Sequence, residues 1–174
     1  MHWVTRQRPK VDRIACPWLI WRFIDRDAQI VYVPADEVLA TAQRLGGHSF
    51  DCCGATYGHR WIADGTEWCT FEVLLQEYAL DTDPGLSELG RIVHAADIAA
   101  DVGSHPFGAA LRALGDAGSD VEPDDQELLR RALFVYDALY AHCLRQALGH
   151  ARPLKVRAKG SRGEPEHART STRS

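Results

Sequence analysis

The chain has 174 residues, of which 45% are hydrophobic and 25% charged. This size and composition are those of one globular domain, and they exclude a disordered, collagen-like or coiled-coil protein. The formal net charge of −4 excludes a nucleic-acid-binding surface spread over the whole chain.

The charge is unevenly distributed along the chain. Residues 151–174 contain seven basic and two acidic residues, a net charge of +5, so residues 1–150 carry −9. We therefore expect an acidic folded body and a basic tail. Such a tail would bind nucleic acid only weakly, through nonspecific attraction to phosphates.

The cysteines and the apolar runs indicate the compartment. None of the five cysteines lies in a CxxC motif, and Cys52 and Cys53 are adjacent, so we expect reduced thiols rather than disulfides or a zinc ribbon. The N-terminus lacks the apolar segment of a signal peptide. The longest apolar run is far shorter than the roughly 20 residues of a membrane span. The sequence therefore predicts a soluble, cytoplasmic protein.

The first third of the chain alternates between predicted strands and helices. A short strand at 3–5 precedes a helix in which Pro17 occupies the first position, where its missing N–H is not needed, and which continues to Asp25. The β-branched and aromatic residues 29–33 indicate a strand. The remaining elements predicted here are a helix at 36–45, a strand at 48–50 and a strand at 60–62 inside a Gly-rich loop.

The rest of the chain shows helical periodicity. Helices are predicted at 70–78, from Asp83-Pro84 to Ala96, at 107–114, and from Pro123 to Ala147. The periodicity ends at Gly149. The sequence therefore predicts an α+β fold with a single domain at 1–148 and a disordered basic tail at 149–174.

The first group of chemically interesting residues is Asp12-Arg13-x-x-Cys16-Pro17. A cysteine immediately before a proline-initiated helix would lie at the N-cap, where the helix dipole and Arg13 favour the thiolate. We therefore consider Cys16 and Arg13 as catalytic residues, and Arg13 with Asp12 as an oxyanion-binding site. A buried cysteine beside a structural Arg–Asp pair is the alternative, because free cysteine is among the most buried residue types.

A second group consists of histidines and carboxylates. His94 and Asp97 are three residues apart and therefore share a helix face, as do many helical metal ligands. Glu72 and His59 complete a possible metal site of mixed nitrogen and oxygen ligands, which suits Zn, Mn or Fe. The alternatives are a salt bridge from Asp97 to an arginine, a solvated Glu72 and an exposed loop histidine.

Several segments of the chain resemble the C-terminal domain of the chromate resistance protein ChrB family. These segments cover about residues 1–145 in the family's order, and they are WVTRQRPKVDRIACPWLIWRFID, VYVPADEVL, GHRWIADGTEWCTFEVLLQEYAL, RIVHAADI and FVYDALYAHC. The candidate residues named above lie in or beside these segments. The resemblance implies a role in bacterial chromate resistance. Longer members carry an N-terminal regulatory region, which we expect this chain to lack because it begins at WVTR.

Together these features suggest a cytoplasmic metal-binding protein that acts in chromate resistance or oxidative stress. Its partner would be chromate or another small oxyanion, bound by Arg13 and helix N–H groups, with metal-dependent redox chemistry as one possible activity. One alternative is a chromate-responsive sensor or transcriptional regulator without catalysis. Another is an interaction module in which all these residues are structural.

Overall fold

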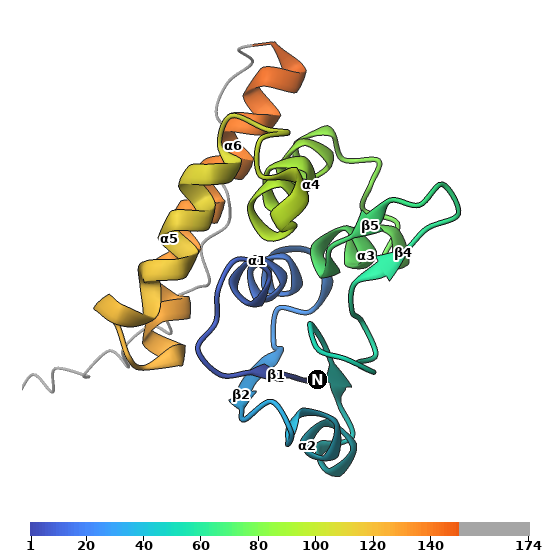
Figure 1. Cartoon of the computed structure of the whole chain (residues 1–174), viewed down its shortest axis with the longest axis vertical. Helices are drawn as coiled ribbons and strands as arrows, with labels where there is room; N and C mark the ends of the chain where they lie inside the picture. The colour runs from blue at the N-terminus through green and yellow to red at the C-terminus, as the bar shows by residue number, and fades with distance from the viewer. Residues whose placement is uncertain (150–174) are drawn as a thin grey trace, which may run out of the picture.

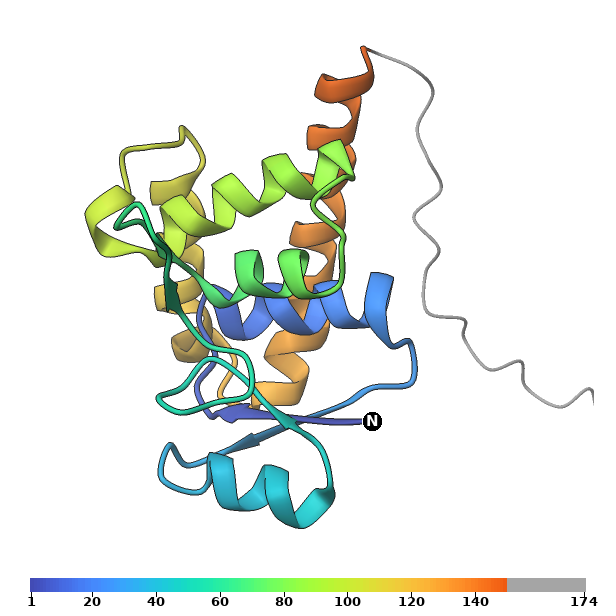
Figure 2. The same cartoon turned by 90° about the vertical axis from the view of Figure 1, so that its right-hand side faces the viewer.

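The computed structural model describes residues 1–149 and confirms an α+β fold (Figure 1). Apart from Gly149, the predicted tail at 149–174 lies outside the described residues. Within the described part, most helices lie on one side of a small parallel sheet, and α2 (Val38–Leu45) lies on the other side (Figure 2).

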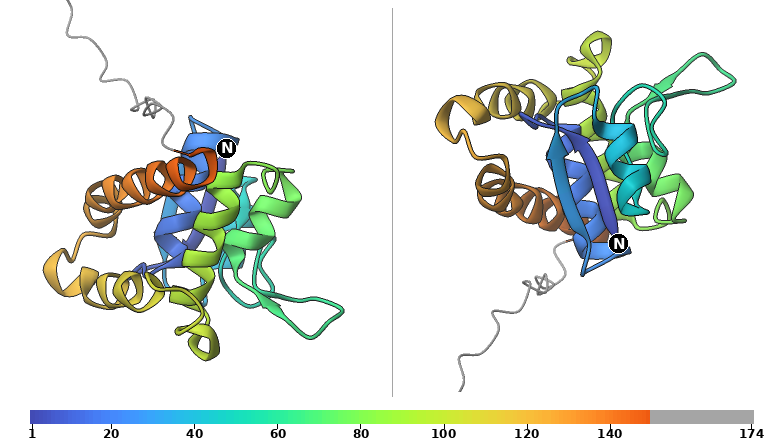
Figure 3. Two further views of the ribbon diagram at one scale, coloured as in Figure 1. Left: turned by 90° about the horizontal axis from the view of Figure 1, so that it is seen from above. Right: turned by 90° about the horizontal axis from the view of Figure 1, so that it is seen from below.

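The sheet places β1 (His2–Arg6) at its centre, with β2 (Gln29–Val33) and β3 (His48–Ser49) parallel to it on either side. Successive side chains of a strand point to opposite faces, so Trp3 and Val4 enter different apolar clusters. Trp3 belongs to the main core beneath the helices, whereas Val4 packs against α2 on the opposite face (Figure 3).

The remaining elements form a layer of helices on one side of the sheet and a short hairpin. Helix α4 lies in the middle of this layer and packs against α3, α5 and α6. The elements are α1 (Asp12–Leu19), which continues into the π-helical turn η1 (Ile20–Ile24), the hairpin β4 (Arg60–Trp61) and β5 (Glu67–Trp68), α3 (Thr70–Glu77), α4 (Pro84–Asp97), the 3-10 turn η2 (Ala99–Asp101), α5 (Gly108–Val121) and α6 (Asp125–Leu148).

Helix α1 corrects the prediction that Pro17 begins the helix and that Cys16 is its N-cap. The helix begins at Asp12, Pro17 lies inside it, and Cys16 is completely buried. A proline inside a helix leaves the carbonyl four residues earlier without its usual donor. Here that carbonyl belongs to Arg13, and the Tyr32 hydroxyl donates to it at 2.8 Å. A contact with β2 therefore compensates for the proline and lets the helix begin a turn earlier.

Helix α4 begins as predicted and is held closely against its neighbours. The Asp83 side chain accepts hydrogen bonds from the backbone N–H groups of Gly85 and Leu86, and Pro84 follows as the first helical residue. At the other end, Gly108 approaches Ala95 so closely that a β-carbon would lie 2.7 Å from the Ala95 Cβ. The position of Asp97, the last residue of α4, is therefore fixed by packing on several sides.

Two helix boundaries differ from those predicted. Helix α5 continues to Val121 rather than ending near Leu114, and α6 begins at Asp125 because the Asp124 side chain caps its first N–H groups. Pro123 thus precedes the cap rather than opening the helix. None of the helices in the part of the chain that the structure describes is long and apolar enough to cross a membrane.

Candidate metal centre

Four polar side chains converge where α1, the loop after β3 and the end of α4 meet. Asp12 is the first residue of α1, Asp51 follows β3, His59 precedes β4, and Asp97 ends α4. The His59 Nε2 atom lies 3.1 Å from Asp97 Oδ2, 3.5 Å from Asp51 Oδ1 and 3.7 Å from Asp12 Oδ2. Three segments distant in the sequence therefore direct carboxylates at one imidazole nitrogen.

Asp12, His59 and Asp97 satisfy the geometry of a metal-binding group. One ligand atom from each residue lies within 4.8 Å of the other two. Among residues 1–149, no other three His, Cys, Asp or Glu side chains approach one another as closely. A divalent ion placed between them would receive one nitrogen and two oxygen ligands.

Asp12 is the most unusual member of this group. Its side chain is 1% exposed, and its Oδ2 accepts a hydrogen bond from the Thr70 N–H at the start of α3. Its other oxygen, Oδ1, is buried without any hydrogen-bond partner. Burial raises the pKa of Asp12 well above its usual value, and the carboxylates of Asp97 and Asp51 raise it further. Such a group costs free energy unless a proton or a cation compensates its charge.

His59 is oriented by a further carboxylate, which contacts its other ring nitrogen. The Nδ1 atom lies 2.9 Å from Glu67 Oε1, and Glu67 belongs to β5 of the hairpin that His59 precedes. Hydrogen bonds to Asp51 and Asp97 raise the pKa of His59 to about 11, so the metal-free site favours a protonated imidazolium. A carboxylate that accepts from one imidazole nitrogen while the other faces the metal is the usual support for a histidine ligand.

Asp51 differs from Asp12 because arginines already neutralise it. Arg6 donates through Nε to the Asp51 carbonyl at 2.9 Å and through Nη2 to its carboxylate at 3.1 Å, and Arg13 Nη1 lies 3.5 Å from the same Oδ2. Burial alone would raise the pKa of Asp51, but His59 and these guanidinium groups lower it below its usual value. Asp51 also has a positive φ of 50°, an uncommon conformation for a residue other than glycine.

A small cavity of about 180 Å³ opens beside the cluster. Its charged walls comprise four basic and four acidic residues, namely Arg6, Lys10, Arg13, Arg112, Asp12, Asp51, Asp97 and Asp116. Arg13 is 12% exposed, and its Nε is buried without a hydrogen-bond partner.

The predicted ligands Glu72 and His94 form a separate pair next to this cluster. Glu72 Oε2 lies 2.7 Å from His94 Nδ1 and also accepts from the Cys69 N–H, while His94 Nε2 lies 3.1 Å from Asp101 Oδ2. Burial would lower the pKa of His94, but hydrogen bonds to Glu72 and Asp101 raise it overall. Of the four predicted ligands, the structure brings together only His59 and Asp97.

The structure also changes two further predictions, the reactive thiol of Cys16 and the role of Asp12 in oxyanion binding. The Cys16 thiol is completely buried, and burial raises its pKa well above the usual value, which is the opposite of the reactive N-cap thiolate expected from the sequence. Asp12 is a buried carboxylate beside the carboxylates of Asp51 and Asp97, so it would repel an oxyanion rather than bind it. The sequence analysis did not identify Asp51 or Glu67; the only signal for them was their proximity to the Gly-rich loop.

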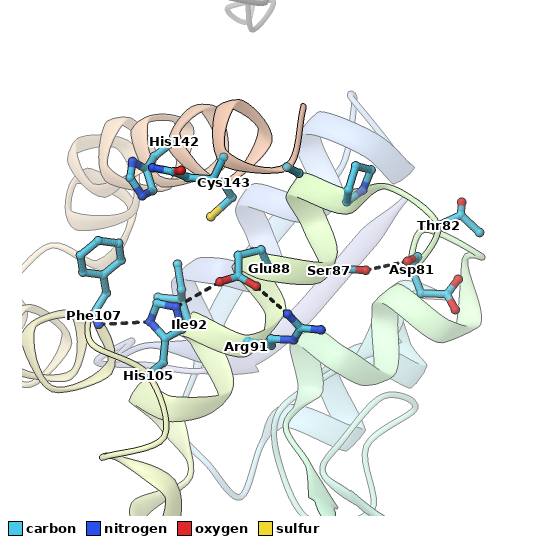
Figure 4. A pocket seen from close by; sticks show the side chains of 13 residues that line it. Asp81, Thr82, Ser87, Glu88, Arg91, Ile92, His105, Phe107, His142 and Cys143 are labelled. Carbon is cyan, nitrogen blue, oxygen red and sulfur yellow. Dashed lines mark hydrogen bonds and ion pairs between the residues drawn. The ribbon is translucent and has the colours of Figure 1, made fainter. Parts of the chain in front are cut away.

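A larger cavity of about 560 Å³ lies between α4, α6 and the loop before α5 (Figure 4). Glu88 lies between Arg91 at 2.8 Å and His105 at 3.2 Å there. Cys143 and Phe107 also line it. Glu88 and Arg91 are already paired with each other, so the acidic cluster with the unpartnered Asp12 oxygen is the stronger candidate site.

Comparisons with known proteins agree with one another. The family model described as "ChrB, C-terminal domain" matches residues 3–143. Protein ChrB of Cupriavidus metallidurans is 39% identical over 142 residues, which cover 80% of this chain and 40% of that protein. The chain thus spans about 40% of the length of the curated relative that it matches. No solved structure matches.

Proposed function

The chain belongs to the family of ChrB C-terminal domains, and on that premise we propose that it holds one divalent metal ion between Asp12, His59 and Asp97. Arg13 and the neighbouring basic side chains would bind a small oxyanion beside the ion. Membership in the ChrB family supports an association with chromate resistance, and chromate is the oxyanion we propose.

The observation that carries this proposal is the buried, unpartnered Oδ1 atom of Asp12. An ordinary structural ion pair leaves no such atom, because buried polar groups are nearly always hydrogen-bonded. A metal ion bound by Asp12, His59 and Asp97 would compensate the charge of this carboxylate, whose Oδ2 lies 3.7 Å from His59 Nε2. It would also replace the proton that the high pKa of Asp12 otherwise favours.

The ligand set limits the metal. One imidazole and two carboxylates suit Zn, Mn or Fe, and the absence of thiolates from the group argues against Cu(I). The bound ion would act as a Lewis acid. Glu67 would keep the Nδ1–H of His59 oriented, so that Nε2 faces the metal as a neutral ligand.

The metal would make the charges around the cavity more favourable to an anion. Four basic and four acidic side chains line it together with His59, so its formal charge is +1 while His59 is protonated. A divalent ion held by a neutral His59 would leave two positive charges in excess, which matches a tetrahedral dianion such as chromate. Arg13 would contribute its guanidinium, since guanidinium groups bind oxyanions through charge-assisted hydrogen bonds.

Metal affinity measured by isothermal titration calorimetry tests the proposal. Asp97→Asn removes a proposed ligand, so we expect Zn²⁺ or Mn²⁺ to bind wild type at one ion per chain and to bind this variant at least about 100-fold more weakly, more than an outer-shell change causes. His94→Gln is the matched control, because His94 lies one turn earlier on α4 and pairs with Glu72. Equal affinity in wild type and Asp97→Asn would contradict the proposal.

A further inference from the structure

Cys52 and Cys53 form an accessible thiol pair at the edge of the metal cluster. Both residues line a cavity of about 490 Å³, whose walls also include Arg6, Asp51 and His59 of the site described above. Cys53 is exposed and Cys52 is half-buried. The other three cysteines of the chain, Cys16, Cys69 and Cys143, are buried. A molecule entering from solvent would therefore meet these two thiols together and no others.

The backbone disfavours a disulfide within this pair. The Cα atoms of adjacent residues are about 3.8 Å apart, whereas disulfides generally join Cα atoms roughly 4.4–6.8 Å apart. Cys52 and Cys53 lie in a tight turn in which the Ala55 N–H donates to the Cys52 carbonyl at 3.1 Å, and Gly54 takes a φ of 75°. The pair therefore tends to remain a dithiol, with both residues lining one cavity.

We propose that Cys52 and Cys53 chelate a thiophilic trivalent metalloid, with arsenic(III) hydroxide as the representative ligand. Two As–S bonds would form, while two As–O and two S–H bonds break and two water molecules leave. Arsenic stays trivalent, so the reaction needs no oxidant or reductant. Sulfur atoms that share one arsenic are not bonded to each other, so the geometry that disfavours a disulfide does not oppose this chelate.

The arginines of the cavity are already paired with carboxylates. Arg6 pairs with Asp51 at 3.1 Å and Arg60 with Glu77 at 2.9 Å. A neutral ligand such as arsenic(III) hydroxide needs no counter-ion from these residues. The half-buried Cys52 also packs against the small apolar cluster beneath α2.

Intact-mass spectrometry of the full chain with phenylarsine oxide tests this proposal. We expect one adduct per wild-type chain, with the mass of the probe minus one water, because two thiols replace the oxide oxygen. In Cys53→Ser a single thiol can only add to the probe without losing water. Loss of the chelate should weaken binding by at least about 100-fold, the usual scale of a second linked contact. Cys52→Ser should behave in the same way.

Cys143→Ser is the control, since that buried thiol lies at the other cavity. It should give the same water-loss adduct as wild type. A water-loss adduct that persists in Cys53→Ser would overturn the proposal. So would wild-type protein that forms no such adduct although a thiol reagent modifies both accessible cysteines. Zn²⁺ binding by Cys53→Ser should equal that of wild type, which separates this site from the metal centre.

Discussion

Asp12 illustrates how a single buried carboxylate can indicate a missing charge. One of its oxygens accepts from Thr70, the other has no partner, and the nearest charged groups include the carboxylates of Asp51 and Asp97. Without a metal, His59 and a retained proton are the available compensation. Because burial raises the Asp12 pKa, this group reduces the stability of metal-free protein once the pH exceeds the unfolded-state value of about 4.

Asp12→Asn should therefore raise the thermal stability of the metal-free protein but reduce the stabilisation that metal provides. In the presence of a chelator at pH 7 we expect the variant to melt at a higher temperature than wild type, because the amide needs no compensating charge. With Zn²⁺ at about 100 times its Kd, wild type should gain about 2.7 kcal/mol and the variant almost nothing. Thermal denaturation with chelator or Zn²⁺ measures both effects. A variant that Zn²⁺ stabilises as much as wild type would exclude Asp12 as a ligand.

At the scale of the elements, Asp137 joins the first helix to the last. It accepts from Trp18 Nε1 at 2.7 Å and from Arg22 Nε at 2.9 Å, and its other oxygen accepts from Arg22 Nη2 at 2.8 Å. Burial alone would raise the pKa of Asp137, but these hydrogen bonds lower it below its usual value. Its ionised form therefore stabilises the contact of α1 and η1 with α6.

This lowered pKa gives stability a defined pH dependence. The contribution should be complete above the unfolded-state pKa of about 4 and disappear as the pH falls through the lower folded-state value. Asp137→Asn should cost about 1.5–3 kcal/mol at pH 7, the range for hydrogen bonds to charged groups. Urea denaturation at pH 7 and at pH 2 measures the difference. A cost that stays unchanged at pH 2 would show that the charge of Asp137 is unimportant.

The elements also show which features are predictable from local sequence. The start of α4 follows from Asp83 and Pro84, whose capping chemistry is local. The start of α1 does not, because the carbonyl that Pro17 frees is satisfied by Tyr32 from another strand. His94 and Asp97 share a helix side as their spacing predicts, yet one meets Glu72 and the other His59. Tertiary packing sets those partners. Periodicity alone could not show that His94 and Glu72 form one pair while Asp97 and His59 belong to another group.

At the scale of the whole molecule, the metal ion would change how strongly the acidic protein attracts an anion. Residues 1–150 carry a formal charge of −9, so an oxyanion is repelled at long range and needs a local positive site. The cavity beside the proposed ion, which Arg13 and three further basic side chains line, offers such a site. Metal binding would therefore strengthen oxyanion binding.

Sulfate, a tetrahedral dianion that does not oxidise thiols, should accordingly bind more tightly to metal-loaded than to metal-free protein. In calorimetric titrations we expect its affinity to fall at least about 10-fold when a chelator removes the metal. Arg13→Gln should weaken sulfate binding without changing metal stoichiometry, whereas Arg91→Gln, at the other cavity, should change neither. Sulfate binding that is equally strong with and without metal would show that oxyanion binding does not depend on the metal ion.

The most direct test of the metal centre is the anomalous diffraction of crystals grown with Zn²⁺. We expect one strong peak roughly 2.0–2.2 Å from His59 Nε2 and from one carboxylate oxygen each of Asp12 and Asp97. A peak between Glu72 and His94, or no peak near Asp12 at saturating Zn²⁺, would contradict the proposed centre.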